Sequence, residues 1–225
     1  LNMLILHVDF RLAPEYTLEE TIEDVINVYQ VLLDADPNIN QRLIGMGDSS
    51  GGMLWIYLLQ WIISNNKPIP QGVVLHSPWP NLDYFDNNVR FSTDIYLSLK
   101  LAYNLRQLVI GKDTNWFEVT DEELSKISPK DNSFEGFPPV YITAGTNEIS
   151  IDAIRDMTEK IRLSDVEVIL DEAEGLMHTY ALFHLWSLQG RRVQERIRQW
   201  IGEQLVIEIK LKSKINTVTT NFECN

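Results

Sequence analysis

A serine inside a glycine-rich pentapeptide has the clearest chemical use in this sequence. Residues 47–51 read Gly-Asp-Ser-Ser-Gly, the pattern G-x-S-x-G. They lie between a short apolar run and the long apolar segment 53–64, which predicts a sharp turn from a strand into a buried helix. Such a turn projects a serine hydroxyl above the sheet, while glycines remove Cβ atoms that would clash with neighbouring backbone. Ser49 is therefore predicted to be a nucleophile.

The same turn has a plainer interpretation, as a helix-capping loop or a cradle for phosphate. A phosphate-binding P-loop needs a lysine directly after its glycines, whereas Met53 follows Gly52 here. We therefore favour the nucleophile. The backbone N–H of Ser50, at the predicted start of the helix, is then placed to donate to the oxyanion formed during acyl transfer.

A serine hydroxyl needs a base to accept its proton, and the sequence offers four histidines. His7 and His76 lie in or at the ends of apolar runs, where a structural role is expected. His184 sits at helical spacing within 180–188. His178 instead follows Glu-Gly-Leu-Met in a loop after a predicted strand, where a side chain reaches the carboxyl end of a sheet. His178 is the predicted base.

The base needs a carboxylate to orient its imidazole. Glu148 is the first carboxylate after the apolar run 140–144, and we expect it to be the acid. Asp152 is the second choice, because Asp152 and Asp156 follow at helical spacing and face the same way. The resulting order, serine then acid then histidine, is that of α/β-hydrolases.

With these motifs the sequence resembles the hormone-sensitive-lipase-like family of α/β-hydrolases, the group containing bacterial esterases and arylacetamide deacetylase. The resemblance spans about residues 4–200. It is carried by His-Val-Asp-Phe-Arg-Leu-Ala-Pro-Glu (7–15), the elbow Gly-Asp-Ser-Ser-Gly-Gly (47–52), His-Ser-Pro-Trp (76–79), Pro-Pro-Val-Tyr-Ile-Thr-Ala-Gly (138–145) and Glu-Gly-Leu-Met-His (174–178). Residues 148–152, Glu-Ile-Ser-Ile-Asp, are similar to the family's E-V-L-L-D variant, which favours Glu148 over Asp152.

The resemblance implies a carboxylic-ester hydrolase that works through an acyl-Ser49 intermediate, without a metal or cofactor, on a small-molecule ester. The alternatives are a non-catalytic small-molecule binding protein on the same scaffold and an inactive fragment. Plant gibberellin receptors, which resemble this family, lack the catalytic histidine. His178 is present here, which argues for catalysis.

Members of the family carry an upstream His-Gly-Gly-Gly loop that completes the oxyanion hole. The sequence starts with Leu, and the family's Arg-Leu-Ala-Pro motif already begins at Arg11. We therefore expect the sequence to correspond to the C-terminal two thirds of a family member. Loss of one oxyanion donor raises the barrier by roughly 3 to 4 kcal/mol, so loss of the loop is expected to weaken or silence the site.

The elements that must position these residues are predicted from hydrophobic period. Short apolar runs alternate with helical segments, which is typical of an α/β fold with a mostly parallel sheet flanked by helices. The predicted strands are 4–8, 42–46, 72–76, 140–144 and 166–170, and the predicted helices are 17–33, 53–64 and 189–204.

Residues 1–225 are predicted to form a single, partial hydrolase domain. Within it, 80–136 carries no strong strand and is expected to be a helical cap insertion. Its aromatic residues either line an acyl pocket or form the packing core of the insertion, and with Trp79 they are Tyr84, Phe85, Phe91, Tyr96, Trp116 and Phe117. The tail 206–225 reads as an extra edge strand over 206–212 or as a disordered end.

Composition excludes several classes of protein. The chain has 225 residues, 44% of them hydrophobic, which excludes intrinsic disorder, and its net charge of −13 disfavours nucleic acid or an anionic membrane as partner. No apolar run reaches the roughly 20 residues of a transmembrane helix. The single cysteine, Cys224, forms no disulfide within the chain, which favours a cytoplasmic location. The oligomeric state is left open.

Overall fold

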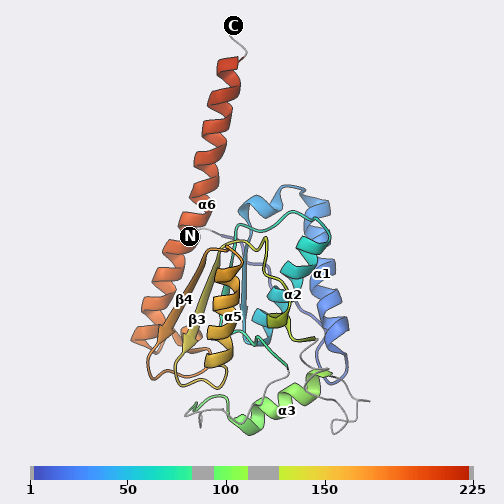
Figure 1. The fold of residues 1–225 in the computed structure, drawn as a ribbon, viewed down its shortest axis with the longest axis vertical. Helices are drawn as coiled ribbons and strands as arrows, with labels where there is room; N and C mark the ends of the chain where they lie inside the picture. Colours follow the sequence, from blue (N-terminus) through green and yellow to red (C-terminus); the bar gives the residue numbers. More distant parts are fainter. Residues whose placement is uncertain (1–2, 83–93, 111–126, 223–225) are drawn as a thin grey trace.

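Four parallel strands form the centre of the molecule. The computed structural model describes residues 3–82, 94–110 and 127–222. The strands follow the order of the sequence across the sheet, as β1 (Ile44–Asp48), β2 (Gly72–His76), β3 (Val140–Gly145) and β4 (Val168–Ala173). Figure 1 shows β3 and β4 side by side. The predicted α/β fold with a parallel sheet is confirmed, and four of the predicted strands lie within two residues of their observed starts.

Every residue of β2 and β3 is buried, because the two strands are covered on both faces. Val73 and Leu75 pack into one hydrophobic cluster, while Val74 between them packs into another. This alternation follows from the twofold period of a strand. The apolar runs of these strands therefore build two cores, one on each face of the sheet.

The helices divide between the two faces. The first face packs against α1 (Leu18–Ala35), α2 (Ser50–Ser64) and α5 (Ile151–Leu163), and the second against α6 (Leu188–Phe222). A further helix, α3 (Leu99–Ile110), lies at the end of the sheet where α6 begins (Figure 1). Short 3-10 turns complete the described elements, as η1 (Ile39–Arg42), η2 (Pro129–Asp131) and η3 (Tyr180–Phe183). None of the helices in the described ranges is long and apolar enough to cross a bilayer.

The start of α1 is set by a capping box. The Oγ1 atom of Thr17 accepts from the backbone N–H of Glu20, and the carboxylate of Glu20 accepts from the backbone N–H of Thr17. Thr21, Val25 and Tyr29 then recur every four residues and are buried.

The expected strand at 4–8 is wrong. Residues 3–10 pair with no strand among the described residues, and the side chains of Leu4 and Ile5 are almost wholly exposed. A strand requires a neighbour for its backbone N–H and C=O groups. In the described sheet, β1 pairs only with β2, and no strand lies beside residues 4–8.

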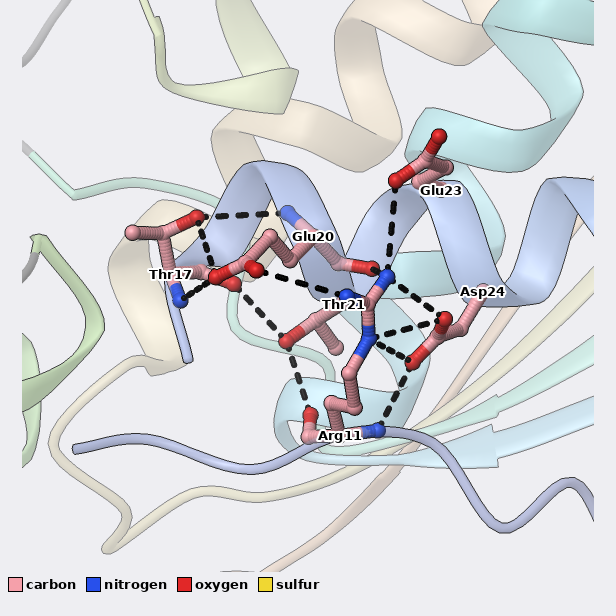
Figure 2. Close-up of polar contacts among 6 residues, drawn as sticks. All are labelled: Arg11, Thr17, Glu20, Thr21, Glu23 and Asp24. Carbon is pink, nitrogen blue, oxygen red and sulfur yellow. Dashed lines mark hydrogen bonds and ion pairs between the residues drawn. The ribbon is translucent and has the colours of Figure 1, made fainter. Parts of the chain in front are cut away.

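Arg11 instead ties this segment to α1 (Figure 2). Its guanidinium pairs with the carboxylates of Asp24, Glu20 and Glu23, at 2.8, 3.3 and 3.4 Å, and its backbone N–H donates to Asp24. The backbone carbonyl of Arg11 accepts from the hydroxyl of Thr21 at 2.9 Å. The guanidinium lowers the pKa of the Asp24 carboxyl. This cluster fixes Arg11 against one face of α1.

The expectations for the tail are also wrong over the described residues. Helix α6 continues without interruption to Phe222, so residues 206–212 form neither an edge strand nor a disordered end. An existing helix propagates residue by residue unless a breaker stops it, and no proline or glycine follows Gly202. Figure 1 shows the last part of α6 extending beyond the sheet, where no strand lies beside it.

His76, at the end of β2, has the structural role expected from its position. The residue is 1% exposed, and its Nδ1 lies 2.9 Å from the hydroxyl of Thr143. Burial lowers the pKa of His76 to about 4. The imidazole is therefore neutral at neutral pH and couples folding to pH.

We predict that His76→Gln flattens the dependence of stability on pH. The unfolded chain binds a proton at this residue below about pH 6.5, whereas the native state binds it only near pH 4, so native stability falls as the pH drops between these values. Between pH 7.5 and pH 5 the loss due to His76 is about 2 kcal/mol. Urea unfolding at both pH values measures it, with the exposed His184→Gln as control. Equal losses in the wild type and in His76→Gln would contradict the prediction.

Candidate active site

Ser49 lies in the sharp turn predicted from its glycines. Strand β1 ends at Asp48 and α2 begins at Ser50, which leaves Ser49 at φ 49° and ψ −115°. This conformation is strained for a residue with a side chain. Backbone hydrogen bonds hold it on both sides. The N–H of Ser49 donates to the carbonyl of His76 at 2.9 Å, and the carbonyl of Ser49 accepts from the N–H groups of Met53 and Trp79.

Two of the three glycines around the serine are required by close backbone approach. A Cβ on Gly47 would lie 2.5 Å from the carbonyl oxygen of Gly51, and a Cβ on Gly52 would lie 2.9 Å from the Cβ of Pro78. A Cβ on Gly51 itself would meet nothing within 4 Å. The expectation that the flanking glycines avoid a clash is therefore right for Gly47 and wrong for Gly51, because Gly51 faces open space.

The structure brings Ser49, His178 and Glu148 into one hydrogen-bonded chain. The Nε2 atom of His178 lies 3.0 Å from the Oγ of Ser49, and its Nδ1 lies 2.7 Å from an oxygen of Glu148. The side chains of His178 and Glu148 are 5% and 0% exposed. Since the carboxylate accepts at Nδ1, the neutral ring carries its proton there, and Nε2 is free to accept the proton of the serine hydroxyl.

Glu148 is held by three further donors. The backbone N–H of Gly145 donates to Oε1 at 2.8 Å, and the hydroxyl of Ser77 donates to the same oxygen at 3.1 Å. The hydroxyl of Ser150 donates to Oε2 at 3.3 Å. A buried carboxylate is stable only when its oxygens are hydrogen-bonded. These donors also fix the orientation of the Glu148 carboxylate toward His178.

Ser77 is a site residue that the sequence analysis missed. It is fully buried after β2, with φ 45°, and its Oγ accepts from the backbone N–H of Thr179 at 2.9 Å. Ser77 therefore joins Glu148 to the residue that follows His178. The sequence feature that pointed to Ser77 was the His-Ser-Pro-Trp segment at the end of a predicted strand, which was used only as evidence of the family resemblance.

The second-choice acid lies elsewhere. The side chain of Asp152 is 63% exposed and pairs with Arg155 at 3.2 Å. Asp156 is 52% exposed and pairs with Lys160 at 3.5 Å. Neither carboxylate contacts the histidine, because the first turns of α5 turn them toward basic side chains at the surface. His7 and His184 are exposed and also lie outside the site.

Ser50, the predicted oxyanion donor, is the first residue of α2. The first N–H groups of a helix have no acceptor within it and carry the positive end of the helix dipole. The amide of Ser50 is one of these groups, and it directly follows Ser49 in the chain.

A hollow open to solvent lies over the serine and the histidine. Its wall is apolar apart from a few polar groups, and the residues that line it are Ser49, Trp79, Asn81, Leu97, Ala102, Leu105, Ile149, Ser150 and His178. Leu97, Ala102 and Leu105 come from the predicted insertion. Among the aromatic candidates for a pocket, Trp79 lines the hollow, while Tyr84, Phe85, Phe91, Trp116 and Phe117 lie outside the described residues.

The described part of the insertion is anchored to the histidine loop. The carboxylate of Asp94 accepts from the backbone N–H of His178 at 3.0 Å, and from those of Tyr96 and Leu97. The ring of Tyr96 stacks on the imidazole of His178, with centroids 6.3 Å apart. Asp94 therefore fixes the position of Leu97, which lines the hollow, relative to the backbone of His178.

Comparison with known families identifies the class of protein. Residues 1–182 match the family described as the alpha/beta hydrolase fold, and the chain belongs to that family. The membership expected from the motifs is confirmed.

Two curated relatives are similar to the chain. One is an esterase from Acinetobacter venetianus, 27% identical over 202 residues, and the other an acetyl-hydrolase from Streptomyces hygroscopicus, 26% identical over 195 residues. The matches cover 88% and 85% of this chain, but 64% and 62% of the relatives. The chain thus spans less than two thirds of their length.

Solved structures show the same fold. The crystal structure of EstE5 superposes with a TM-score of 0.78, and that of EstE7, a hormone-sensitive lipase homologue from a metagenome library, with a TM-score of 0.77. Each is 23% identical to the chain and covers 88% of it, while the chain covers 65% and 66% of their lengths.

We predict that Ser77→Ala destabilises the native state by about 1 to 3 kcal/mol. The change leaves the buried N–H of Thr179 without its acceptor and removes one donor from Glu148. Alanine keeps the Cβ, so strain at φ 45° is unaltered. Urea unfolding measures the change, with the exposed Ser133→Ala as control. A loss no larger than that of the control would show that the Ser77 hydroxyl does not stabilise this loop.

Proposed function

We propose that the protein is a carboxylic-ester hydrolase in which Ser49, His178 and Glu148 act as nucleophile, base and acid. The observation that carries the proposal is the hydrogen-bonded chain from a strained serine through a buried imidazole to a buried carboxylate. The names of the two curated relatives, an esterase and an acetyl-hydrolase, support an ester as substrate. The name acetyl-hydrolase favours esters of short acyl groups or acetylated small molecules, and the apolar wall of the hollow suits their hydrocarbon parts.

In the first half of the reaction, the Oγ of Ser49 attacks the carbonyl carbon of the ester while Nε2 of His178 accepts its proton. The carbonyl oxygen becomes an oxyanion, to which the N–H of Ser50 donates. The tetrahedral intermediate then collapses. The bond to the alcohol oxygen breaks, and His178 gives its proton to the departing alcohol.

In the second half, water attacks the acyl-Ser49 ester and His178 accepts its proton. Collapse of the second tetrahedral intermediate releases the carboxylic acid and returns the proton to Ser49. Glu148 stabilises the imidazolium in both halves without itself being protonated. The hydrogen bonds from Gly145, Ser77 and Ser150 keep its oxygens fixed while this charge forms.

Labelling of Ser49 by a fluorophosphonate tests the proposal. The chain is incubated with the probe after near-UV circular dichroism has established that it is folded, and the modified peptide is identified by mass spectrometry. We expect labelling at Ser49 that Ser49→Ala abolishes and His178→Ala reduces by at least a factor of about 10³. Labelling that survives the loss of His178 would overturn the assignment of the base.

A folded but unlabelled chain would overturn the proposal for this chain as it stands. The sequence contains no His-Gly-Gly-Gly segment, so the same assay on a chain extended upstream with such a segment separates a missing oxyanion donor from an inactive site. If both chains bind a small-molecule ester saturably but neither is labelled, the alternative of a non-catalytic binding protein is favoured.

Two carboxylate variants form a matched pair. We predict that Glu148→Gln lowers the rate of hydrolysis of 4-nitrophenyl acetate by a factor of about 10⁴. The amide of glutamine favours the wrong tautomer of His178, and because it carries no charge it does not stabilise the imidazolium. Asp152→Asn removes a carboxylate of the same segment that pairs with Arg155 at the surface, and should change the rate by less than about twofold. A large loss in Asp152→Asn alone would reverse the choice of acid.

A further inference from the structure

Asn81 is a buried polar side chain that lines the hollow together with Ser49 and His178. The residue is only 4% exposed. Over the ranges 3–82, 94–110 and 127–222, the structure gives its carboxamide no hydrogen-bond partner. The fully buried side-chain atoms that lack a partner among the described residues are His76 Nε2, Tyr180 OH and Trp200 Nε1. The amide atoms of Asn81 are not among them, so they keep a small accessible surface that a ligand in the hollow can reach.

The backbone on both sides of Asn81 is fixed. The carbonyl of Pro80 accepts from the N–H of Lys130 at 3.0 Å, and the N–H of Leu82 donates to the hydroxyl of Ser128 at 2.7 Å. The side chain of Leu82 is fully buried against Met53 of α2. These contacts fix the backbone on both sides of Asn81, so the residue keeps its place in the wall of the hollow.

Most of the other residues that line the hollow carry apolar side chains, namely Trp79, Leu97, Ala102, Leu105 and Ile149, and the remainder are Ser49, Ser150 and His178. A leucine of similar size would fill the same position without an unpaired amide. A polar group held in an apolar pocket orients a ligand, and it disfavours analogues that leave it unpaired.

We propose that Asn81 is a specificity-determining residue that binds a hydroxyl group carried by the substrate, so that this hydrolase prefers hydroxylated esters over alkyl esters of equal size. The inference rests on the proposed function for the identity of the ligand as an ester. A hydroxyl matches the carboxamide because each group both donates and accepts. The scissile carbonyl faces Ser49 and Ser50, so the hydroxyl lies on the acyl or the alcohol portion.

Binding to the Ser49→Ala chain tests the inference separately from turnover. Two pairs of esters differ only by a hydroxyl in place of a methyl group. Ethyl 3-hydroxybutyrate and ethyl 3-methylbutyrate probe the acyl side, and 2-hydroxypropyl butyrate and 2-methylpropyl butyrate probe the alcohol side. Quenching of tryptophan fluorescence reports binding, since Trp79 lines the hollow. Dissociation constants are compared in the Ser49→Ala chain and in the same chain carrying Asn81→Leu.

We expect the hydroxylated ester of one pair to bind about tenfold more tightly than its partner, and Asn81→Leu to abolish that preference. The pair that responds identifies the acyl or the alcohol side. Asn132→Leu, the same change at an exposed position outside the hollow, should retain the preference.

A preference for the methyl ester in both pairs would overturn the inference. This outcome is measured without any variant at Asn81, so the test remains valid even if Asn81→Leu does not fold. Equal weakening of both members of each pair by Asn81→Leu would also overturn it, because the residue would then be structural. If the fluorophosphonate does not label Ser49 in the wild-type chain, the proposed hydrolase activity is overturned. The binding preferences of the Ser49→Ala chain can still be measured in that case.

Discussion

The buried carboxylate of Glu148 is the group on which the arrangement of the site depends. Removing an ionised carboxylate from water costs several kcal/mol, which the protein must offset with hydrogen bonds and opposite charge. Gly145 and Ser150 supply donors from its own loop, Ser77 supplies one from the end of β2, and His178 supplies one from the loop after β4. The fold must bring three strand ends together before this carboxylate is stable.

The parallel register of the sheet meets that requirement. The ends of parallel strands lie at one edge of the sheet, so loops far apart in sequence converge there. The end of β3 also passes so near the histidine loop that a Cβ on Gly145 would lie 2.3 Å from the carbonyl oxygen of Leu176. Glycine at this position therefore lets the carboxylate and the imidazole approach within hydrogen-bond distance.

Strain is concentrated at the same edge. Ser49 and Ser77 follow adjacent strands, and both have positive φ. Each such residue costs about 1 to 3 kcal/mol and persists only where its surroundings hold it. The carbonyl of His76 and the N–H of Trp79 hold Ser49, and Glu148 and Thr179 hold Ser77. The hydroxyl that is proposed to attack and the hydroxyl that holds the acid are thus positioned by the same strand pair.

Local pattern was sufficient for the elements whose signals are local. Buried strands, the amphipathic α1 and the glycine turn at Ser49 follow from residue period and type. Glu148 was placed ahead of Asp152 because it is the first carboxylate after the run 140–144 and because residues 148–152 resemble a variant of the family. The segment 4–8 and the tail 206–212 failed for one shared reason. An apolar or alternating run forms a strand only beside a partner, and the presence of a partner is a property of the whole sheet. Ser77 was missed because its use depends on groups 71 and 102 residues away in the sequence.

His76 and His178 show how far position, rather than residue type, decides the chemistry of this edge. His76 lies within β2, where the sheet buries its ring and lowers its pKa to about 4, so it is a poor acceptor of a proton from a serine. His178 lies in the loop after β4, and its ring is free to bridge a carboxylate and a hydroxyl. The carbonyl of His76 nevertheless fixes the N–H of Ser49. One histidine thus holds the backbone of the proposed nucleophile, while the other is placed to accept its proton.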